Sequence, residues 1–188
     1  MNAFMKFFGM MLLTGYINSC QDPSPDSISK AKDANKSKTE NSMKHEEITE
    51  FLIKIADARM MGIEEGKEAM QKGTKEEIRN YGSWMIQEQS KLQEQVKLIA
   101  DSKGITLPAN ISKDKQDGLE DLQEKTGTEF DKKFMKMMII DHKRDLKDFK
   151  KAQEYKDQQV ASFASKYLAV IQSHLDKIEQ IEENYSSK

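Results

Sequence analysis

The sequence predicts an all-α fold, an antiparallel four-helix bundle with a long middle crossover that contains a short extra helix. Beyond Ser42, apolar residues recur along four long segments at the i, i+3, i+4 spacing of one helix face. Alternating runs rich in Val, Ile and Thr, which would indicate strands, do not interrupt this pattern. A chain of 188 residues has room for one ordinary domain.

The first hairpin is predicted to join a helix over residues 43–72 to a helix that ends near residue 102. Gly73 separates the two, and Thr74-Lys75-Glu76-Glu77 has the pattern of a capping box, which would satisfy backbone amides at the start of the second helix. Gly104 and Pro108 then end that helix. The residues expected to face inward are Ile48, Phe51, Leu52, Ile55, Ala58, Gly62, Gly66, Ala69, Ile78, Tyr81, Met85, Leu92, Val96 and Ile99.

The second hairpin is predicted over residues 128–155 and 157–184, and a short helix over 113–125 precedes it. The connections near Gly73 and Lys156 are very short, so each joins an antiparallel pair. The connection over 103–127 is long enough to travel the length of the bundle, as it does in a ferritin-like bundle; the alternative is a plain up-down bundle with the short helix as a lid. The inward residues expected here are Phe130, Phe134, Met138, Leu146, Phe149, Val160, Phe163, Tyr167, Ile171, Leu175 and Ile178.

The N-terminal segment indicates export and lipidation. Residues 1–19 carry one positive charge, at Lys6, followed by a short apolar run, which is a signal-peptide pattern. Cys20 follows Ile17-Asn18-Ser19, which resembles a bacterial lipobox, so we expect cleavage before an acylated Cys20; the alternative is a free cysteine. Residues 20–42 contain few apolar side chains and are predicted to be a disordered tether. The folded domain is expected over residues 43–188.

Charge and motif content exclude several functions. A formal net charge of −2 with intermixed signs argues against nucleic-acid binding. Along the fourth long segment, Lys143-Arg144-Asp145 and Lys147-Asp148 alternate in sign, which is typical of a solvated helix face. A nucleophile with a base at recognisable spacing and a Gly-rich phosphate loop are both missing from the sequence. We therefore expect a protein that is not an enzyme.

Two histidines on inward helix faces make a single metal ion the sharpest hypothesis. His142 and His174 lie at similar heights from the turn near Lys156, with Asp57 and Gln89 at a comparable depth in the other hairpin. The candidate ligands for zinc, copper or iron are His142, His174, Glu64, Glu88 and Asp141. A di-iron site would need Glu-x-x-His pairs, and Ile139 and Ile171 stand where the glutamates would be. Met135, Met137 and Met138 would suit Cu(I) but also suit core packing, and two core histidines without a metal remain the simpler alternative.

Ala58, Gly62 and Gly66 form a smooth ridge at i, i+4, i+8. Glycine inside a helix costs about 1 kcal/mol relative to alanine, so a packing reason is expected. Close approach of a neighbouring helix is the simplest one, and a groove for an apolar ligand or partner helix is the alternative.

Several short motifs in order resemble the domain of unknown function 4142 family over residues 46–182. The motifs are Phe51-Leu52-Ile53-Lys54, Ile63-Glu64-Glu65-Gly66-Lys67, Lys103-Gly104-Ile105-Thr106-Leu107-Pro108, Phe130-Asp131-Lys132, Asp141-His142-Lys143 and His174-Leu175. The resemblance implies a ferritin-like bundle in an exported bacterial protein, often described as an outer-membrane protein, and implies no activity. Two departures weaken any metal site in the first hairpin: Gly62 stands where the family usually has Glu, and Gln87-Glu88-Gln89 stands where its acidic motif ends in His.

Together these features predict an envelope lipoprotein, anchored in a membrane, most simply the outer one, that acts as a binding or structural module. Its partners would be the membrane, through the lipid anchor, and an envelope protein or a small ligand. A metal-binding or metal-storage protein is the alternative.

Overall fold

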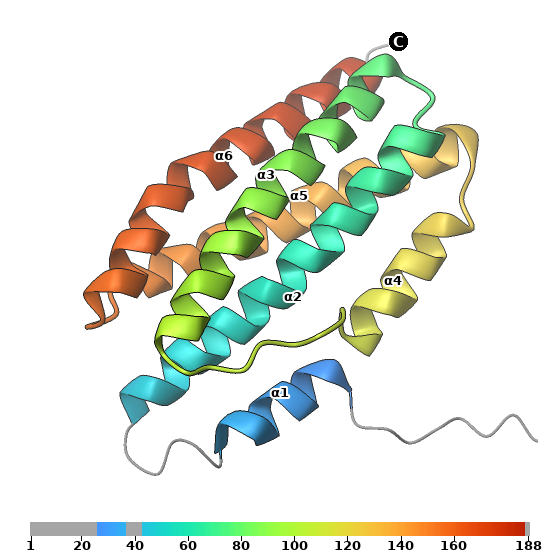
Figure 1. The fold of residues 1–188 in the computed structure, drawn as a ribbon. Coiled ribbons are helices and arrows are strands. Elements are labelled where there is room, and N and C mark those ends of the chain that lie inside the picture. The colour runs from blue at the N-terminus through green and yellow to red at the C-terminus, as the bar shows by residue number, and fades with distance from the viewer. Residues whose placement is uncertain (1–25, 37–42, 187–188) are drawn as a thin grey trace, which may run out of the picture.

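The computed structural model describes residues 26–36 and 43–186, which fold into helices without a strand (Figure 1). The four long helices form a bundle, and two shorter helices lie along it. In chain order the helices are α1 (Ser27–Lys36), α2 (Met43–Lys72), α3 (Glu76–Ser102), α4 (Lys113–Gln123), α5 (Gly127–Ala152) and α6 (Gln158–Ser186).

The topology is the ferritin-like one. Helix α2 packs on α3, and α5 packs on α6, while α2 also contacts α5 and α3 contacts α6. Thr74, before α3, contacts Asp131 near the start of α5, whereas Lys103, after α3, contacts Asp157 between α5 and α6. Helices α3 and α5 therefore run in the same direction. The crossover between them travels the length of the bundle and carries α4 along α2 and α5 (Figure 1).

Apolar side chains from all four long helices form one core. Most of the inward residues predicted from spacing are buried; Ala58 and Tyr167 are partly exposed. Near the α5–α6 turn, the Phe51 ring meets the rings of Phe149 and Phe163 edge-on, with centroids 5.4 and 6.4 Å away. Aromatic contacts of this kind add about 0.5–1.5 kcal/mol each beyond the area they bury.

The capping box predicted at Thr74 is not formed. Helix α3 begins at Glu76 with Lys75 as its N-cap, and no side chain caps its backbone amides. The Thr74 backbone N–H instead donates to Asp131 Oδ1 at 3.0 Å, and its hydroxyl donates to Asp131 Oδ2. Thr74 thus ties the α2–α3 turn to α5, because its backbone N–H and its hydroxyl both donate to the buried Asp131 carboxylate, and hydrogen bonds to an ionised acceptor are stronger than neutral ones.

The prediction of disorder over residues 20–42 is wrong for residues 27–36, which form α1. The Asn35 side chain is buried; its amide donates to the Thr106 carbonyl, and its Oδ1 accepts from the Thr106 N–H, both at 2.8 Å. Ala31 is buried as well. The helix docks largely through polar contacts with the crossover, which a search for apolar residues overlooks. The predicted signal peptide and Cys20 lie outside the described residues.

Helices α2 and α3 approach closely at two glycines. A Cβ on Gly82 would lie 2.6 Å from the Gly66 carbonyl oxygen, and one on Gly66 would lie 2.8 Å from the Gly82 carbonyl oxygen. Close approach of a neighbouring helix backbone, the simplest explanation of the small-residue ridge, is confirmed at Gly66; at Gly62 the neighbour is the Gln89 side chain. Gly62 and Gly66 are buried, and Ala58 and Gly62 line an internal cavity beside α3.

Replacing Gly82 by Ala is expected to lower the free energy of unfolding by about 1–3 kcal/mol, because the added methyl group would push two backbones apart. Urea unfolding measures the change. Gly118→Ala in α4 is the matched control: nothing lies within 4 Å of its added Cβ, so this variant should gain up to about 1 kcal/mol of helix propensity. Equal effects at the two glycines would contradict the close approach.

Candidate functional site

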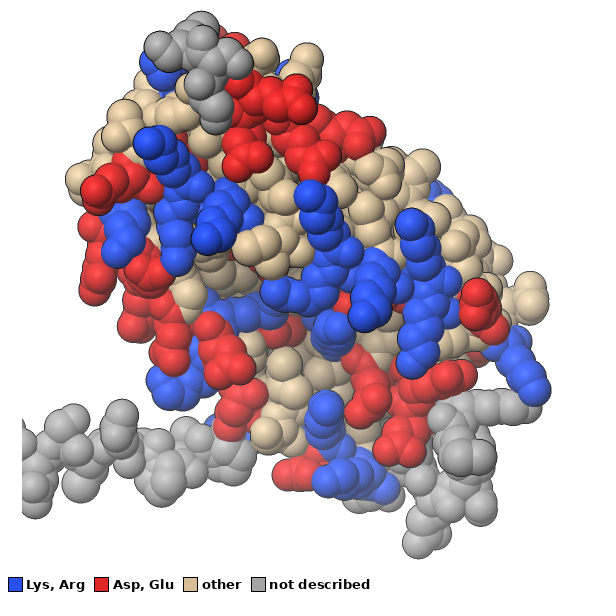
Figure 2. Space-filling view, turned by 180° about the vertical axis from the view of Figure 1, so that it is seen from behind, with Lys and Arg blue, Asp and Glu red and all other residues tan. Residues whose placement is uncertain are grey.

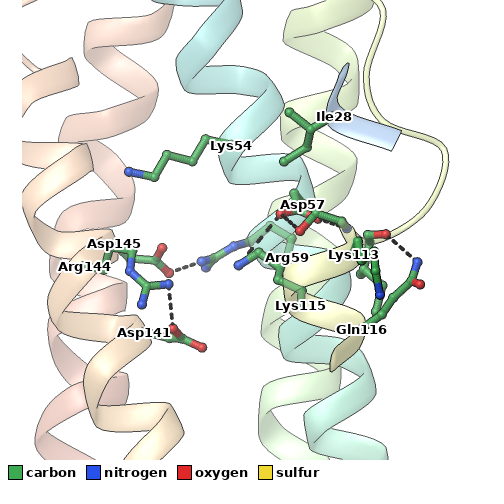
Figure 3. A network of polar contacts seen from close by, with 12 residues as sticks. Ile28, Lys54, Asp57, Arg59, Lys113, Lys115, Gln116, Asp141, Arg144 and Asp145 are labelled. Carbon is green, nitrogen blue, oxygen red and sulfur yellow. Dashed lines mark hydrogen bonds and ion pairs between the residues drawn. The ribbon is translucent and has the colours of Figure 1, made fainter. Parts of the chain in front are cut away.

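A cavity of about 290 Å³ lies inside the bundle, beneath the start of α4. It is lined by polar and charged side chains from α2, α3, α4 and α5, and Ile28 of α1 stands at its edge (Figure 3). The polar residues that line it are Lys54, Asp57, Arg59, Glu65, Gln89, Ser112, Asp114, Lys115, Asp141, His142, Arg144 and Asp145.

Arg59 is the buried cation of this cavity. Its side chain is 2% exposed and reaches from α2 to α5, where Nη2 forms an ion pair with Asp145 Oδ2 (Figure 3). Its Nε and Nη1 groups have no hydrogen-bond partner among the described residues. Burial lowers the pKa of Arg59 to about 10, while Asp141 and Glu65 oppose this shift. The guanidinium is therefore charged at neutral pH and retains two unmatched donors.

Glu65 is a buried acid on the same helix. Burial raises the pKa of Glu65 well above its ordinary value, and the charge of Asp141 adds to the shift, while Lys115 and Arg59 oppose it. Its Oε1 atom has no hydrogen-bond partner among the described residues. Glu65 is therefore held toward its neutral form, while the Arg59–Asp145 pair and the Asp57 carboxylate are the buried charged groups of the cavity.

His142 and His174 meet in the core, as their spacing along α5 and α6 predicts. Their ring centroids lie 5.5 Å apart. His142 Nδ1 donates to the Met138 carbonyl at 2.6 Å, so its Nε2, which has no partner among the described residues, carries a lone pair. Both ring nitrogens of His174 also lack partners there, and its ring packs on Trp84. Burial lowers the pKa of His142 to about 4 and that of His174 to about 3, so both rings are neutral at pH 7.

Gln89 and Gly62 lie against each other on the inner wall of the cavity. A Cβ on Gly62 would lie 3.2 Å from Gln89 Cγ. The two positions where the sequence departs from the family pattern thus meet in space. Gln89 Nε2 contacts the Met85 sulfur at 3.8 Å, and Gln89 Oε1 has no partner among the described residues.

Asp57 fixes the start of α4 over the cavity. Its Oδ1 accepts from the Ser112 backbone N–H at 2.7 Å, and its Oδ2 accepts from the Ser112 hydroxyl at 3.0 Å. Lys115 Nζ lies 3.9 Å from Asp57 Oδ2. The depth predicted for Asp57 and Gln89 is confirmed, since both line the cavity beside His142.

The remaining predicted metal ligands lie apart from the histidine pair. Glu64 and Glu88 are partly exposed and form ion pairs with Lys67 and Lys91 one turn along their own helices. Asp141 lies at the cavity but pairs with Arg144 at 2.9 Å. Across residues 26–36 and 43–186, no group of three or more His, Cys, Asp or Glu side chains is placed to hold a metal ion.

Sequence reasoning missed Arg59, Glu65 and Asp145. Each lies on an inward helix stripe, and this was the available signal: Arg59 follows Ile55 by four residues, and Asp145 follows His142 by three. A charged residue inside an apolar stripe is rarely buried unless it is paired.

The fold and the cavity define a class: a ferritin-like helical bundle with a buried arginine–carboxylate pair and two neutral histidines beside a small internal cavity. The chain belongs to the family described as domain of unknown function (DUF4142), whose model matches residues 33–181. Curated proteins and solved structures give no match to the chain. Within the described residues, the helices are too short or too polar to cross a membrane.

Proposed function

We propose that the protein is a binding module of the bacterial cell envelope, not an enzyme, and that its interhelical cavity takes a small anionic molecule on Arg59. The observation that carries the proposal is the buried guanidinium, which lines a cavity with two donors unmatched. Leaving a buried hydrogen-bonding group unpaired costs about 1–3 kcal/mol, and a ligand that pairs it recovers this free energy.

The groups around Arg59 indicate the chemical class and the size of the ligand. The guanidinium favours a carboxylate or a similar anion. Gln89 Oε1 and His142 Nε2 line the same cavity as unmatched acceptors, so they favour a ligand that also carries hydroxyl or amine donors. A volume of about 290 Å³ is at the lower end for ligand pockets, which indicates a compact molecule.

The location in the envelope is supported by the N-terminal sequence. The signal-peptide pattern of residues 1–19 and the lipobox-like segment before Cys20 would place the domain on a lipid anchor. Two or more acyl chains hold a protein stably on a membrane. The resemblance of the chain to exported proteins makes the outer membrane the preferred site.

Thermal unfolding of the full chain tests the proposal with three compact probes. Glycerate has both a carboxylate and hydroxyl groups, propionate lacks the hydroxyls, and glycerol lacks the carboxylate. Glycerate at 100 times its Kd should stabilise the chain by about 2.7 kcal/mol, and the other two probes should have smaller effects. Measured shifts that do not differ among the three probes would contradict the proposal.

The matched variants are Arg59→Gln/Asp145→Asn, which removes both charges of the buried pair, and Glu64→Gln/Lys67→Gln, which removes an exposed ion pair from α2. The first should abolish the response to glycerate, and the second should retain it. A response that survives the first variant would place the ligand elsewhere.

A metal-binding function is the second candidate, favoured by the two histidine rings at 5.5 Å and their three unmatched nitrogens. The described residues supply two imidazoles and no third ligand in position, so this candidate ranks second. Its test is metal content and thermal stability with zinc, copper or iron, compared with His142→Ala/His174→Ala. Near-stoichiometric metal, with a stabilisation that the double variant loses, would make this the function instead.

A further inference from the structure

The bundle separates the charges of α5, although they alternate in the sequence. Asp131 and Asp145 are buried, whereas Asp141 and Asp148 form ion pairs with Arg144 and Lys54. The lysines of α5 lie mainly on its outward face, where they are exposed. Between Lys132 and Lys150 the exposed residues that share this face are Lys132, Lys136, Ile140, Lys143, Lys147 and Lys150, and exposed Glu129 lies on the same face one turn before them.

These six residues form a continuous stripe, here called the α5 basic stripe. At about 100° per residue they fall within an arc of roughly 80°, and the stripe is roughly 27 Å long at 1.5 Å rise per residue. Seen from behind the view of Figure 1, Lys and Arg side chains gather in a band across the middle of the molecule (Figure 2). Exposed Ile140, at 45%, interrupts the lysines with an apolar side chain.

Most of the charge on the stripe is uncompensated. Lys143 pairs with Glu179 of α6 at 2.7 Å. In the part of the chain that the structure describes, the other four lysines of the stripe have no carboxylate within ion-pair distance. A row of like charges on a rigid helix repels itself unless an anionic surface lies against it.

We propose that the α5 basic stripe docks on an anionic lipid surface. Lysine ammonium groups act as hydrated point charges and suit a plane of headgroups, whereas arginine would favour bidentate recognition of single phosphates. The exposed isoleucine at the centre suits an interface with acyl chains below the headgroups. Each lysine at such a surface strengthens binding about fivefold, and salt screens the attraction. The inference depends neither on the cavity ligand nor on acylation of Cys20.

Sedimentation of the full chain with vesicles tests this surface. The vesicles are phosphatidylcholine, with or without one third phosphatidylglycerol, and the readout is the ratio of binding to the two. Lys132→Gln/Lys136→Gln/Lys147→Gln/Lys150→Gln removes the unpaired charges of the stripe. Lys67→Gln/Lys75→Gln/Lys97→Gln/Lys166→Gln, which removes four exposed lysines elsewhere, is the matched control. All the proteins share the same N-terminal residues, so differences in their vesicle binding measure the contribution of the stripe.

We expect the wild-type chain and the control to prefer the anionic vesicles by at least tenfold, a preference that high salt removes. The stripe variant should lose it, and Ile140→Ser should weaken binding to anionic vesicles while leaving its salt dependence unchanged. Equal preference in the stripe variant and the control would overturn the proposal. Tight binding to soluble dextran sulfate without binding to anionic vesicles would also overturn it and would indicate a polyanionic glycan.

Discussion

Arg59→Met is expected to lower the free energy of unfolding by about 3–5 kcal/mol, because it leaves the buried Asp145 carboxylate without a counter-charge. In the native protein, Arg59 and Asp145 are 2% and 7% exposed at their side chains and pair across α2 and α5. Removing the guanidinium leaves Asp145 without its opposite charge inside the bundle. Urea unfolding at pH 7, followed by circular dichroism, measures the loss.

Two further variants distinguish the stability effect of this buried pair from that of an exposed ion pair. Arg59→Met/Asp145→Leu replaces both charges by apolar groups and should recover most of the stability that the single variant loses. Lys67→Ala breaks an exposed pair with Glu64, at 50% and 42% exposure, and should cost about 0–1 kcal/mol. A loss below 1 kcal/mol in Arg59→Met would contradict the burial of the charge pair.

The long helices could be predicted because their signals are local. Gly73 and Gly104 break two amphipathic runs, and the observed ends of α2 and α3 lie within a few residues of these glycines. The length of the connection over 103–127 allowed a crossover along the bundle but also an up-down bundle with a lid, and the contacts of Thr74 with Asp131 and of Lys103 with Asp157 decide for the crossover. The meeting of His142 with His174 followed from counting residues away from the shared turn.

The features that escaped prediction depend on contacts between distant segments. Thr74 has the pattern of an N-cap, but Asp131, far along the chain, is its partner. Asn35 looks like part of a polar tether until the crossover backbone is placed beside it. The pairing of Arg59 with Asp145 depends on how α2 is positioned along α5, which periodicity within either helix does not determine.

Acid should destabilise the protein between about pH 6.5 and pH 4, because the two core histidines resist protonation. Burial lowers the pKa of His142 to about 4 and that of His174 to about 3, whereas an unfolded chain protonates histidine near its ordinary pKa of 6.5. In this window the unfolded state binds more protons than the folded state, so stability falls as the pH falls. The expected loss is more than about 3 kcal/mol, measured by urea unfolding over this pH range.

Glu65 should act in the opposite direction, because its pKa is raised in the folded state. The stability from its neutral form is fully present below the unfolded pKa and is lost as the pH rises through the folded value. Glu65→Gln keeps a neutral side chain of the same shape, so it should gain stability over the wild type as the pH rises. His142→Gln/His174→Leu should instead flatten the acid side of the profile. An acid loss that persists in this double variant would contradict its assignment to the two histidines. A pH-independent difference for Glu65→Gln would mean that Glu65 ionises as readily in the folded chain as in the unfolded one.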